Sequence, residues 1–295
     1  MTPWVVPLPG NEALARSLTR SVDGELGQLE TRKFPDGESY LRIDPNCSGR
    51  SVALVCTLDR PDAKLLPLLF AADTARELGA ARVGLVAPYL AYMRQDRRFR
   101  EGEAVTSRIF ADLLSSRLDW LLTVDPHLHR YHSLEELYRV PARVVHAAPA
   151  LAAWIAEAVD RPLLIGPDEE SAQWVADVGS RVGAPHLVLT KIRRGDHDVE
   201  VSVPRIEEHR DRTPVVLDDI VSSARTMIQT VRHLVDAGLP SPVCLAVHAV
   251  LAEPAEKALR EAGAAALVST NTIVHSTNAI DLAPLLGPVL GELVL

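Results

Sequence analysis

Residues 213–238 read TPVVLDDIVSSARTMIQTVRHLVDAG. A short apolar run in this stretch ends at two adjacent carboxylates, Asp218 and Asp219. Apolar residues then recur at helical spacing as far as Val235. The pattern predicts a strand, a loop and a helix, with the two acids at the carboxyl end of the strand.

Hydroxyl side chains gather where this helix should begin, at Ser222, Ser223 and Thr226. Ligands bind outside the carboxyl ends of the strands in an open α/β sheet, and a helix start offers free N–H groups to an anion. Two acids followed by an anion site suit a sugar phosphate, with the acids accepting from ring hydroxyls. A solvated turn with an N-cap serine is the alternative that this stretch alone leaves open.

Strand and helix patterns alternate along the rest of the chain, which indicates an α/β fold with mainly parallel sheets flanked by helices. The ranges that we predict as strands are 51–58, 82–87, 120–124, 163–165, 186–190 and 199–203. The predicted helices, besides the one above, are 61–78, 105–117 and 171–182.

The two halves of the chain resemble each other. Residues 50–90 align with residues 212–251, with strand, helix, glycine and strand in the same order. Two tandem copies of one domain account for this repeat, and we expect domains of 1–146 and 147–295. Cys56 and Thr57 occupy the positions of the acidic pair in the first copy, which indicates that this copy serves another purpose.

The composition is that of an ordinary globular protein, 47% hydrophobic and 24% charged. A formal net charge of −8 argues against a general nucleic-acid binder. No apolar run approaches the ~20 residues that span a bilayer, so we expect a cytoplasmic protein without a membrane partner. Three cysteines without paired spacing are expected to be buried apolar residues.

Four polar segments lie where loops are expected: 34–38, 94–98, 125–132 and 191–196. The first has an aromatic ring beside two acids, and the second offers arginine forks that suit a polyphosphate. The third combines an acid with three histidines, which favours magnesium over zinc because no further zinc-ligand pattern follows. The fourth is a basic turn. Each taken alone also fits a solvated turn or charge run.

In this order the segments resemble the ribose-phosphate pyrophosphokinase family, the phosphoribosyl diphosphate (PRPP) synthetases. The resemblance implies two tandem phosphoribosyltransferase-type (type I) domains. It also implies transfer of the diphosphoryl group of ATP to ribose 5-phosphate with Mg²⁺, for nucleotide biosynthesis. A homo-oligomer with an ATP site shared between subunits is a further implication.

The resemblance assigns roles to individual residues. Those matching the ATP-binding segments are Phe34, Asp36, Glu38, Arg94, Gln95 and Arg97. His127 and Asp168 match metal-linked positions, and Lys191 and Arg193 match the two basic residues of a catalytic loop. Those matching the ribose 5-phosphate site are Asp218, Asp219, Ser222, Ser223, Ala224, Arg225 and Thr226.

Two departures from the family pattern stand out. Ala224 and Arg225 replace a pair of glycines in the phosphate loop, which changes how backbone amides meet the phosphate. Glu169 and Glu170 follow Asp168 where small residues are common, and this added acid would repel substrate, recruit metal or face solvent.

Three other functions remain as alternatives. A phosphoribosyltransferase would use the same acidic pair and anion loop but needs no ATP site. A catalytically weak homologue that regulates a partner fits the two departures, although the pair Lys191 and Arg193 argues against it. An unrelated metal hydrolase would be built on the histidine segment. The absence of a GxxxxGK[ST] segment argues against a P-loop kinase.

Overall fold

The structure is a computed structural model that describes residues 2–128, 130–193, 199–202 and 206–295. The chain forms two compact units. Unit 1 comprises Met1–Val145, Thr272–Val274 and Leu282–Leu295, and unit 2 comprises His146–Asn271 and His275–Asp281. The boundary between the units falls between Val145 and His146, and the C-terminal segment groups with unit 1 and not with the residues that precede it.

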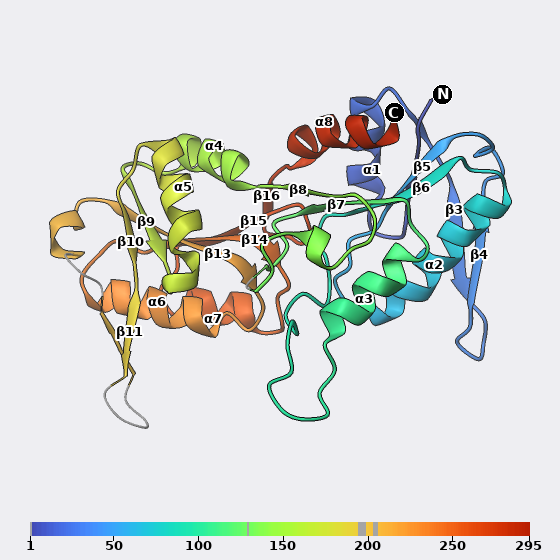
Figure 1. The fold of residues 1–295 in the computed structure, drawn as a ribbon. Coiled ribbons are helices and arrows are strands. Elements are labelled where there is room, and N and C mark those ends of the chain that lie inside the picture. Colours follow the sequence, from blue (N-terminus) through green and yellow to red (C-terminus); the bar gives the residue numbers. More distant parts are fainter. Residues whose placement is uncertain (1, 129, 194–198, 203–205) are drawn as a thin grey trace. The chain divides into compact units, whose positions relative to one another are not determined.

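Unit 1 is built on a six-stranded sheet in the order β2-β1-β5-β6-β7-β8, in which all neighbouring strands are parallel (Figure 1). Its strands are β1 (Trp4–Pro7), β2 (Glu25–Leu26), β5 (Ser51–Val55), β6 (Arg82–Ala87), β7 (Trp120–Val124) and β8 (Ala142–Val145). An antiparallel hairpin of β3 (Leu29–Lys33) and β4 (Ser39–Ile43) is inserted before β5.

Helices cover both faces of this sheet. Figure 1 shows α1 (Glu12–Ser21) and α8 (Ala283–Val294) on one face, and α2 (Asp62–Glu77) and α3 (Thr106–Ser115) on the other. A short 3-10 helix, η1 (Leu134–Glu136), precedes β8. The core consists of the strands' apolar side chains and the inward sides of α2 and α3, including the fully buried Leu68 and Ala72. Burying such side chains contributes roughly 1.5–3 kcal/mol for each large one.

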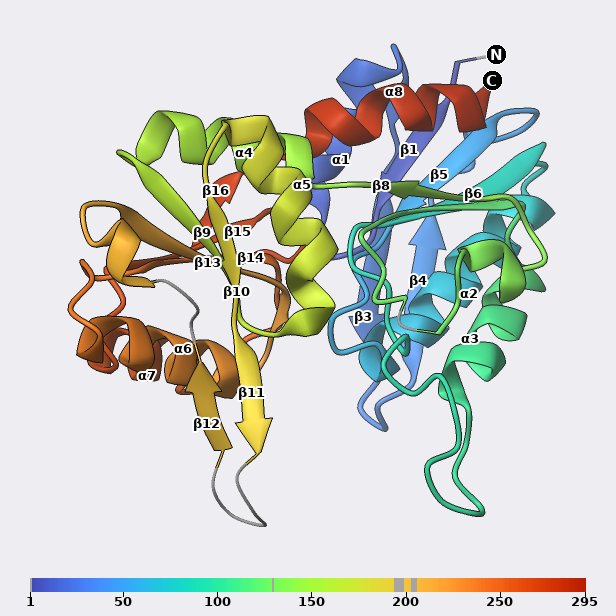
Figure 2. The same cartoon turned by 60° about the vertical axis from the view of Figure 1, so that its left-hand side comes forward.

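Unit 2 repeats the plan with a parallel sheet in the order β10-β9-β13-β14-β15-β16. Its strands are β9 (Pro162–Gly166), β10 (His186–Val188), β13 (Thr213–Val221), β14 (Val243–Ala249), β15 (Ala266–Thr270) and β16 (Asn278–Ile280). Figure 2 shows the antiparallel pair β11 (Thr190–Arg193) and β12 (Val199–Ser202) beside this sheet. The helical elements are α4 (Ala148–Ala158), η2 (Glu169–Ser171), α5 (Ala172–Val182), η3 (Ile206–His209), α6 (Arg225–Asp236) and α7 (Ala255–Glu261).

The α/β class and the two-domain plan that the sequence predicts are confirmed, and three boundaries are corrected. The strand predicted at 51–58 ends at Val55. The strand predicted at 186–190 divides into β10 and the start of β11. The strand predicted at the start of residues 213–238 runs on to Val221, because Ile220 and Val221 still pair with β14. The three cysteines are buried and free, as predicted.

Candidate functional site

A cluster of carboxylates lies at the carboxyl edge of the sheet in unit 2. Asp218 and Asp219 belong to the last part of β13, beyond Val216, which pairs with Ile165 of β9. Because β9 ends at Gly166, the acids project past the end of their neighbouring strand. Asp168 follows β9 by two residues, so the same edge carries it. The structure thus brings together three of the acids predicted as site residues.

The acids repel one another electrostatically. Burial raises the pKa of the Asp218 carboxyl well above its ordinary value, and the charges of Asp219 and Asp168 raise that pKa further. Two backbone donors partly offset this repulsion. The Asp219 N–H donates to Asp218 Oδ1 at 3.1 Å, and the Ile220 N–H donates to Asp219 Oδ1 at 2.7 Å. A site with this much acid at close range is stabilised by a bound cation or by hydroxyl donors.

The loop between β13 and α6 has the form of an anion site. Ser222 and Ser223 lie in this loop, and Thr226 lies in the first turn of α6. Ala224 is the residue before the helix and has φ 56°, in the left-handed region. No side-chain hydrogen bond caps the helix, so its first N–H groups are open to an anion. Arg225 is exposed beside them.

Ala224 is therefore strained as well as unusual in sequence. A left-handed conformation costs a residue with a Cβ roughly 1–2 kcal/mol, whereas glycine adopts it freely. The loop keeps the backbone conformation that glycine favours although alanine occupies it. Arg225 adds a positive charge at the same place. This charge compensates for the loss of glycine's backbone flexibility only if the ligand of the loop is negatively charged.

Asp168 is held by the 3-10 helix that follows it. Its carboxylate accepts from the Ser171 N–H at 3.3 Å, and the Ser171 hydroxyl donates to the Asp168 carbonyl at 2.6 Å. Glu169 is exposed, which corresponds to the solvent-facing alternative for this residue. The side chain of Glu170 lies outside the described residues.

Lys191 and Arg193 both lie on β11, which pairs with β12 from Thr190↔Ser202 to Arg193↔Val199. The basic turn predicted over 191–196 is wrong for residues 191–193, because they pair with β12 as part of a strand. Their side chains, and residues 194–198 between the strands, lie outside the described part of the chain.

In unit 1 the predicted adenine-binding segment is the tip of the β3–β4 hairpin. The Phe34 N–H donates to the Glu38 carbonyl at 2.8 Å, and the Gly37 N–H donates to the Phe34 carbonyl at 2.9 Å. Asp36 closes the turn by accepting from the Glu38 N–H at 3.1 Å. Phe34 itself is 38% exposed. The turn thus presents a ring and two acids to solvent.

Sequence reasoning missed two side chains that support this ring. The Arg32 guanidinium lies 4.6 Å from the Phe34 ring centre and 4.2 Å from that of Tyr40. Tyr40 meets Phe34 edge to face, with ring centres 6.2 Å apart. The signal was available, because alternate residues of a strand share a face and Arg32 pairs directly with Tyr40.

The second and third polar segments of unit 1 are joined to each other. The Arg130 guanidinium lies 3.4 Å from the Asp96 carboxylate, which is 7% exposed. The Tyr131 hydroxyl donates to the Asp96 carbonyl at 3.2 Å. The structure therefore brings the arginine loop with Arg94, Gln95 and Arg97 next to the segment after β7.

The arginine loop has its own internal order. Glu103 accepts from the backbone N–H groups of Phe99 and Arg100 at 2.8 and 3.0 Å. The Arg97 guanidinium lies 4.5 Å from the Phe99 ring centre. Arg94 and Arg97 are exposed and Gln95 is half-buried. Two guanidinium groups are thus available to an anion on a loop that is already shaped.

His127 lies in the segment after β7, two residues beyond Asp125, and is half-buried. Asp125 has φ 32° and donates its N–H to the Val145 carbonyl at 3.1 Å. His129 lies outside the described residues. Within the part of the chain that the structure describes, no three His, Cys, Asp or Glu side chains form a metal-binding group. The described helices also include none long and apolar enough to cross a membrane.

Comparisons with known proteins match both units. Residues 4–117 match the model of the N-terminal domain of ribose phosphate pyrophosphokinase, and residues 133–282 match the model of the phosphoribosyl transferase domain. A ribose-phosphate pyrophosphokinase from Methanothermobacter thermautotrophicus is 33% identical over 290 residues, covering 98% of this chain and all of the relative. The protein of that name from Methanopyrus kandleri is 35% identical over 274 residues, covering 92% of each chain.

A solved structure has the same fold. The phosphoribosylpyrophosphate synthetase from Mycobacterium smegmatis matches with a TM-score of 0.85 and 22% sequence identity, over 99% of both chains. At that identity the match establishes the fold.

Proposed function

The chain belongs to the ribose-phosphate pyrophosphokinase family, and we propose that it transfers the β,γ-diphosphoryl group of ATP to ribose 5-phosphate. In this reaction the C1 hydroxyl oxygen bonds to the β-phosphorus of ATP. The bond from that phosphorus to the α,β-bridging oxygen breaks, so AMP leaves and PRPP forms. The reaction supplies PRPP for nucleotide biosynthesis.

The observation that carries the proposal is the carboxyl edge of unit 2. Asp218 and Asp219 stand beside a hydroxyl loop whose backbone is shaped like a glycine-rich anion site. The acids would accept from the ring hydroxyls of ribose 5-phosphate. Ser222, Ser223 and Thr226, with the first N–H groups of α6, would hold the 5-phosphate, and Arg225 would add charge.

Magnesium fits the residues present. Hard cations prefer oxygen ligands, and Mg²⁺ is usually held by one or two carboxylates together with substrate phosphates. The charges of Asp219 and Asp168 raise the pKa of the Asp218 carboxyl, which supports a cation beside these carboxylates. His127 is the proposed metal-linked residue of unit 1. When bound, Mg²⁺ would neutralise charge on the diphosphoryl group.

Lys191 and Arg193 are proposed to act on the group in transfer. Diphosphoryl transfer concentrates charge on phosphate oxygens, and positioned cations stabilise that charge without a covalent intermediate. Lys191 and Arg193 stand two positions apart on β11. Closing over the substrates would also exclude water from the ATP bond.

ATP is proposed to bind through unit 1. Phe34, with Asp36 and Glu38, would take the adenine, and Arg94, Gln95 and Arg97 would take the phosphates. We also propose a homo-oligomer in which the Phe34 hairpin completes the ATP site of a neighbouring subunit, and a cytoplasmic enzyme, since that is where ATP and sugar phosphates meet. A phosphoribosyltransferase has no use for these ATP-binding features, so the diphosphokinase is preferred.

The test is to mix purified protein with ATP, Mg²⁺ and ribose 5-phosphate and to follow phosphorus NMR signals. Equal formation of AMP and PRPP is expected. Formation of ADP instead would mean transfer of a single phosphoryl group and would contradict the proposal. Binding of both substrates without turnover would favour the regulatory homologue over the enzyme.

A further inference from the structure

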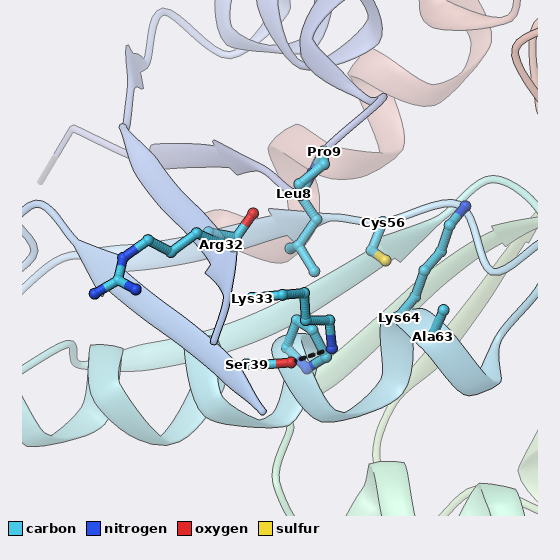
Figure 3. A pocket seen from close by; sticks show the side chains of 10 residues that line it. Leu8, Pro9, Arg32, Lys33, Ser39, Cys56, Ala63 and Lys64 are labelled. Carbon is cyan, nitrogen blue, oxygen red and sulfur yellow. Dashed lines mark hydrogen bonds between the residues drawn. The ribbon is translucent and has the colours of Figure 1, made fainter. Parts of the chain in front are cut away.

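The carboxyl edge of the sheet in unit 1 contains a cavity of about 290 Å³ (Figure 3). Small-molecule sites usually occupy about 300–1,000 Å³, so the cavity suits a small ligand. Its lining comes from the ends of β1 and β5, the start of α2 and the β3–β4 hairpin.

The topology of the sheet places this cavity at a switch point. The chain goes from β1 to β2 on one side and returns through the hairpin to β5 on the other side of β1. In open α/β sheets, ligands bind outside the carboxyl ends of the two strands at which the order reverses. Leu8 and Cys56, which line the cavity, follow β1 and β5 directly.

Unit 2 has the same switch point between β9 and β13, and there it carries the proposed ribose 5-phosphate site. The alignment of the two halves matches Val55 with Leu217. Pro7 pairs with Val55 in unit 1, and Ile165 pairs with Val216 in unit 2. Extending this match along the strands toward their carboxyl ends pairs three positions of unit 1 with the acids of unit 2. Pro9 corresponds to Asp168, Cys56 to Asp218, and Thr57 to Asp219. The cavity is therefore the duplicate of that site with every acid replaced.

Positive charge remains where the acids are lost. Lys33 Nζ lies 2.6 Å from Ser39 Oγ, and Figure 3 shows this pair at the cavity. In the described part of the chain, Lys33 has no acidic partner. The other lysine of the lining, Lys64, is paired with Asp59 and donates to the Thr57 carbonyl at 2.9 Å. The ammonium of Lys33 carries three donors and uses one, so it can receive an anion.

The remaining walls are largely apolar. Leu8, Pro9, Cys56, Ala63 and Pro67 line the space. Thr31 and Arg32 line it as well, but the Arg32 guanidinium lies over the Phe34 and Tyr40 rings. Burial raises the pKa of the Cys56 thiol to about 12, so this wall is uncharged. A phosphate dianion or a hydrated metal ion would find too few polar partners here, whereas an apolar body with a single negative charge would be matched on both sides.

We propose that this cavity binds a small organic carboxylate with an apolar body, held through Lys33 and Ser39 and without a divalent metal. The residues of this ligand site differ from those of the proposed site of diphosphoryl transfer in unit 2. It gives the first copy of the duplicated domain a binding function of its own at the position where the second copy binds its sugar phosphate.

The experiment uses the full chain labelled with ¹³C-lysine, which contains four lysines: Lys33, Lys64, Lys191 and Lys257. Sodium benzoate is the probe, and the ε-methylene signals are followed without ATP or ribose 5-phosphate. The Lys33 signal is expected to shift saturably, while the signal of Lys257, an exposed residue of α7 in unit 2, stays unchanged. Each of the two signals is assigned by its disappearance in the variant that lacks that lysine, Lys33→Met or Lys257→Met.

Two variants test the two halves of the proposed contact. Benzoate binding, measured by calorimetry, should weaken at least roughly tenfold in Lys33→Met, because the ammonium is lost, and stay unchanged in Lys257→Met. Ala63→Leu, on the exposed first turn of α2, should fill the cavity and remove the saturable Lys33 shift. Thermal melting verifies that each variant folds.

Three results would overturn the proposal: no Lys33 shift with benzoate, an unaltered shift in Ala63→Leu, or a Lys33 shift produced by inorganic phosphate but not by benzoate. The last would assign the cavity to a different chemical class. Because no substrate of the diphosphokinase is present, these outcomes are independent of whether the chain makes PRPP.

Discussion

Ala224 combines a left-handed backbone with a Cβ at the start of the anion loop. Replacing it by glycine removes the steric cost of about 1–2 kcal/mol, and the added freedom of the unfolded chain offsets roughly 0.5–1 kcal/mol of this gain. Ala224→Gly should therefore raise the free energy of unfolding by about 0.5–1 kcal/mol in urea titrations. Ala237→Gly at the other end of α6, where φ is −75°, is the matched control and should lower it. Equal effects of the two changes would mean that Ala224 is not strained.

Asp218 links the chemistry of the site to stability. The pKa of its carboxyl is higher in the folded protein than in the unfolded chain. At a pH between these two pKa values, the folded protein keeps the proton on Asp218, whereas the unfolded chain has lost it. Stability then falls as pH rises through that window. Without Mg²⁺, Asp218→Asn should stabilise the protein by on the order of 1 kcal/mol at pH 7.5 and by almost nothing near pH 4.

Thermal melts across this pH range, with a chelator present, measure the difference. Asp236→Asn, at an exposed position on α6, serves as control and should show no such trend. A gain for Asp218→Asn that is the same at both pH values would rule out mutual repulsion of the acids as its cause.

Lys191 is predicted to act in the transition state. Lys191→Ala should lower kcat by roughly 10²–10³-fold, the loss typical of one oxyanion donor, while the dissociation constant for ATP changes far less. Steady-state kinetics and calorimetry with ATP supply the two numbers. If affinity falls as much as turnover, the lysine contributes to ground-state binding instead.

The β3–β4 hairpin acts as a unit because one face of it carries Arg32, Phe34 and Tyr40 in contact. Removing the guanidinium frees the Phe34 ring to take other rotamers, which adds an ordering cost to each binding event. Arg32→Ala should raise KM for ATP by roughly three- to tenfold, an effect of about 1 kcal/mol, and leave KM for ribose 5-phosphate unchanged.

Arg42→Ala, on the same hairpin but 3.8 Å from Glu30 in an exposed pair, is the control and should change neither constant. An equal rise in KM for both substrates in Arg32→Ala would indicate general loosening of the hairpin.

Strands that are short, continuous apolar runs were predictable from sequence, because such runs are typical of buried parallel strands. The strands 82–87 and 120–124 match β6 and β7 residue for residue. The extension of β13 to Val221 was not predictable, because it depends on pairing with β14. The other neighbour, β9, pairs with β13 only as far as Val216. Likewise the Asp96–Arg130 link joins segments that are 34 residues apart, and only the fold brings them together.

Some features of the site followed from residue types alone. The acids of β13 and the hydroxyls before α6 could be assigned to the site from sequence, because only the end of a strand and the start of a helix had to be recognised. The supporting contacts did not, since Arg32 lies on the first strand of the hairpin and Tyr40 on the second. These contacts depend on the pairing of Arg32 with Tyr40 across the two strands, so they can be predicted only once the register of the hairpin is known.

Two neighbouring subunits are proposed to contribute residues to each active site. In the proposed oligomer each active site takes Phe34 from one subunit and Lys191 from another. Phe34→Ala and Lys191→Ala proteins should each be nearly inactive, but an equal mixture allowed to exchange subunits should recover about a quarter of the wild-type rate. Half of the sites receive an intact Phe34 and, independently, half receive an intact Lys191. Coupled measurement of AMP release against mixing ratio checks this, with each variant mixed with wild type as control. A site completed within one chain would give no recovery at any ratio, and the shared ATP site would then be wrong.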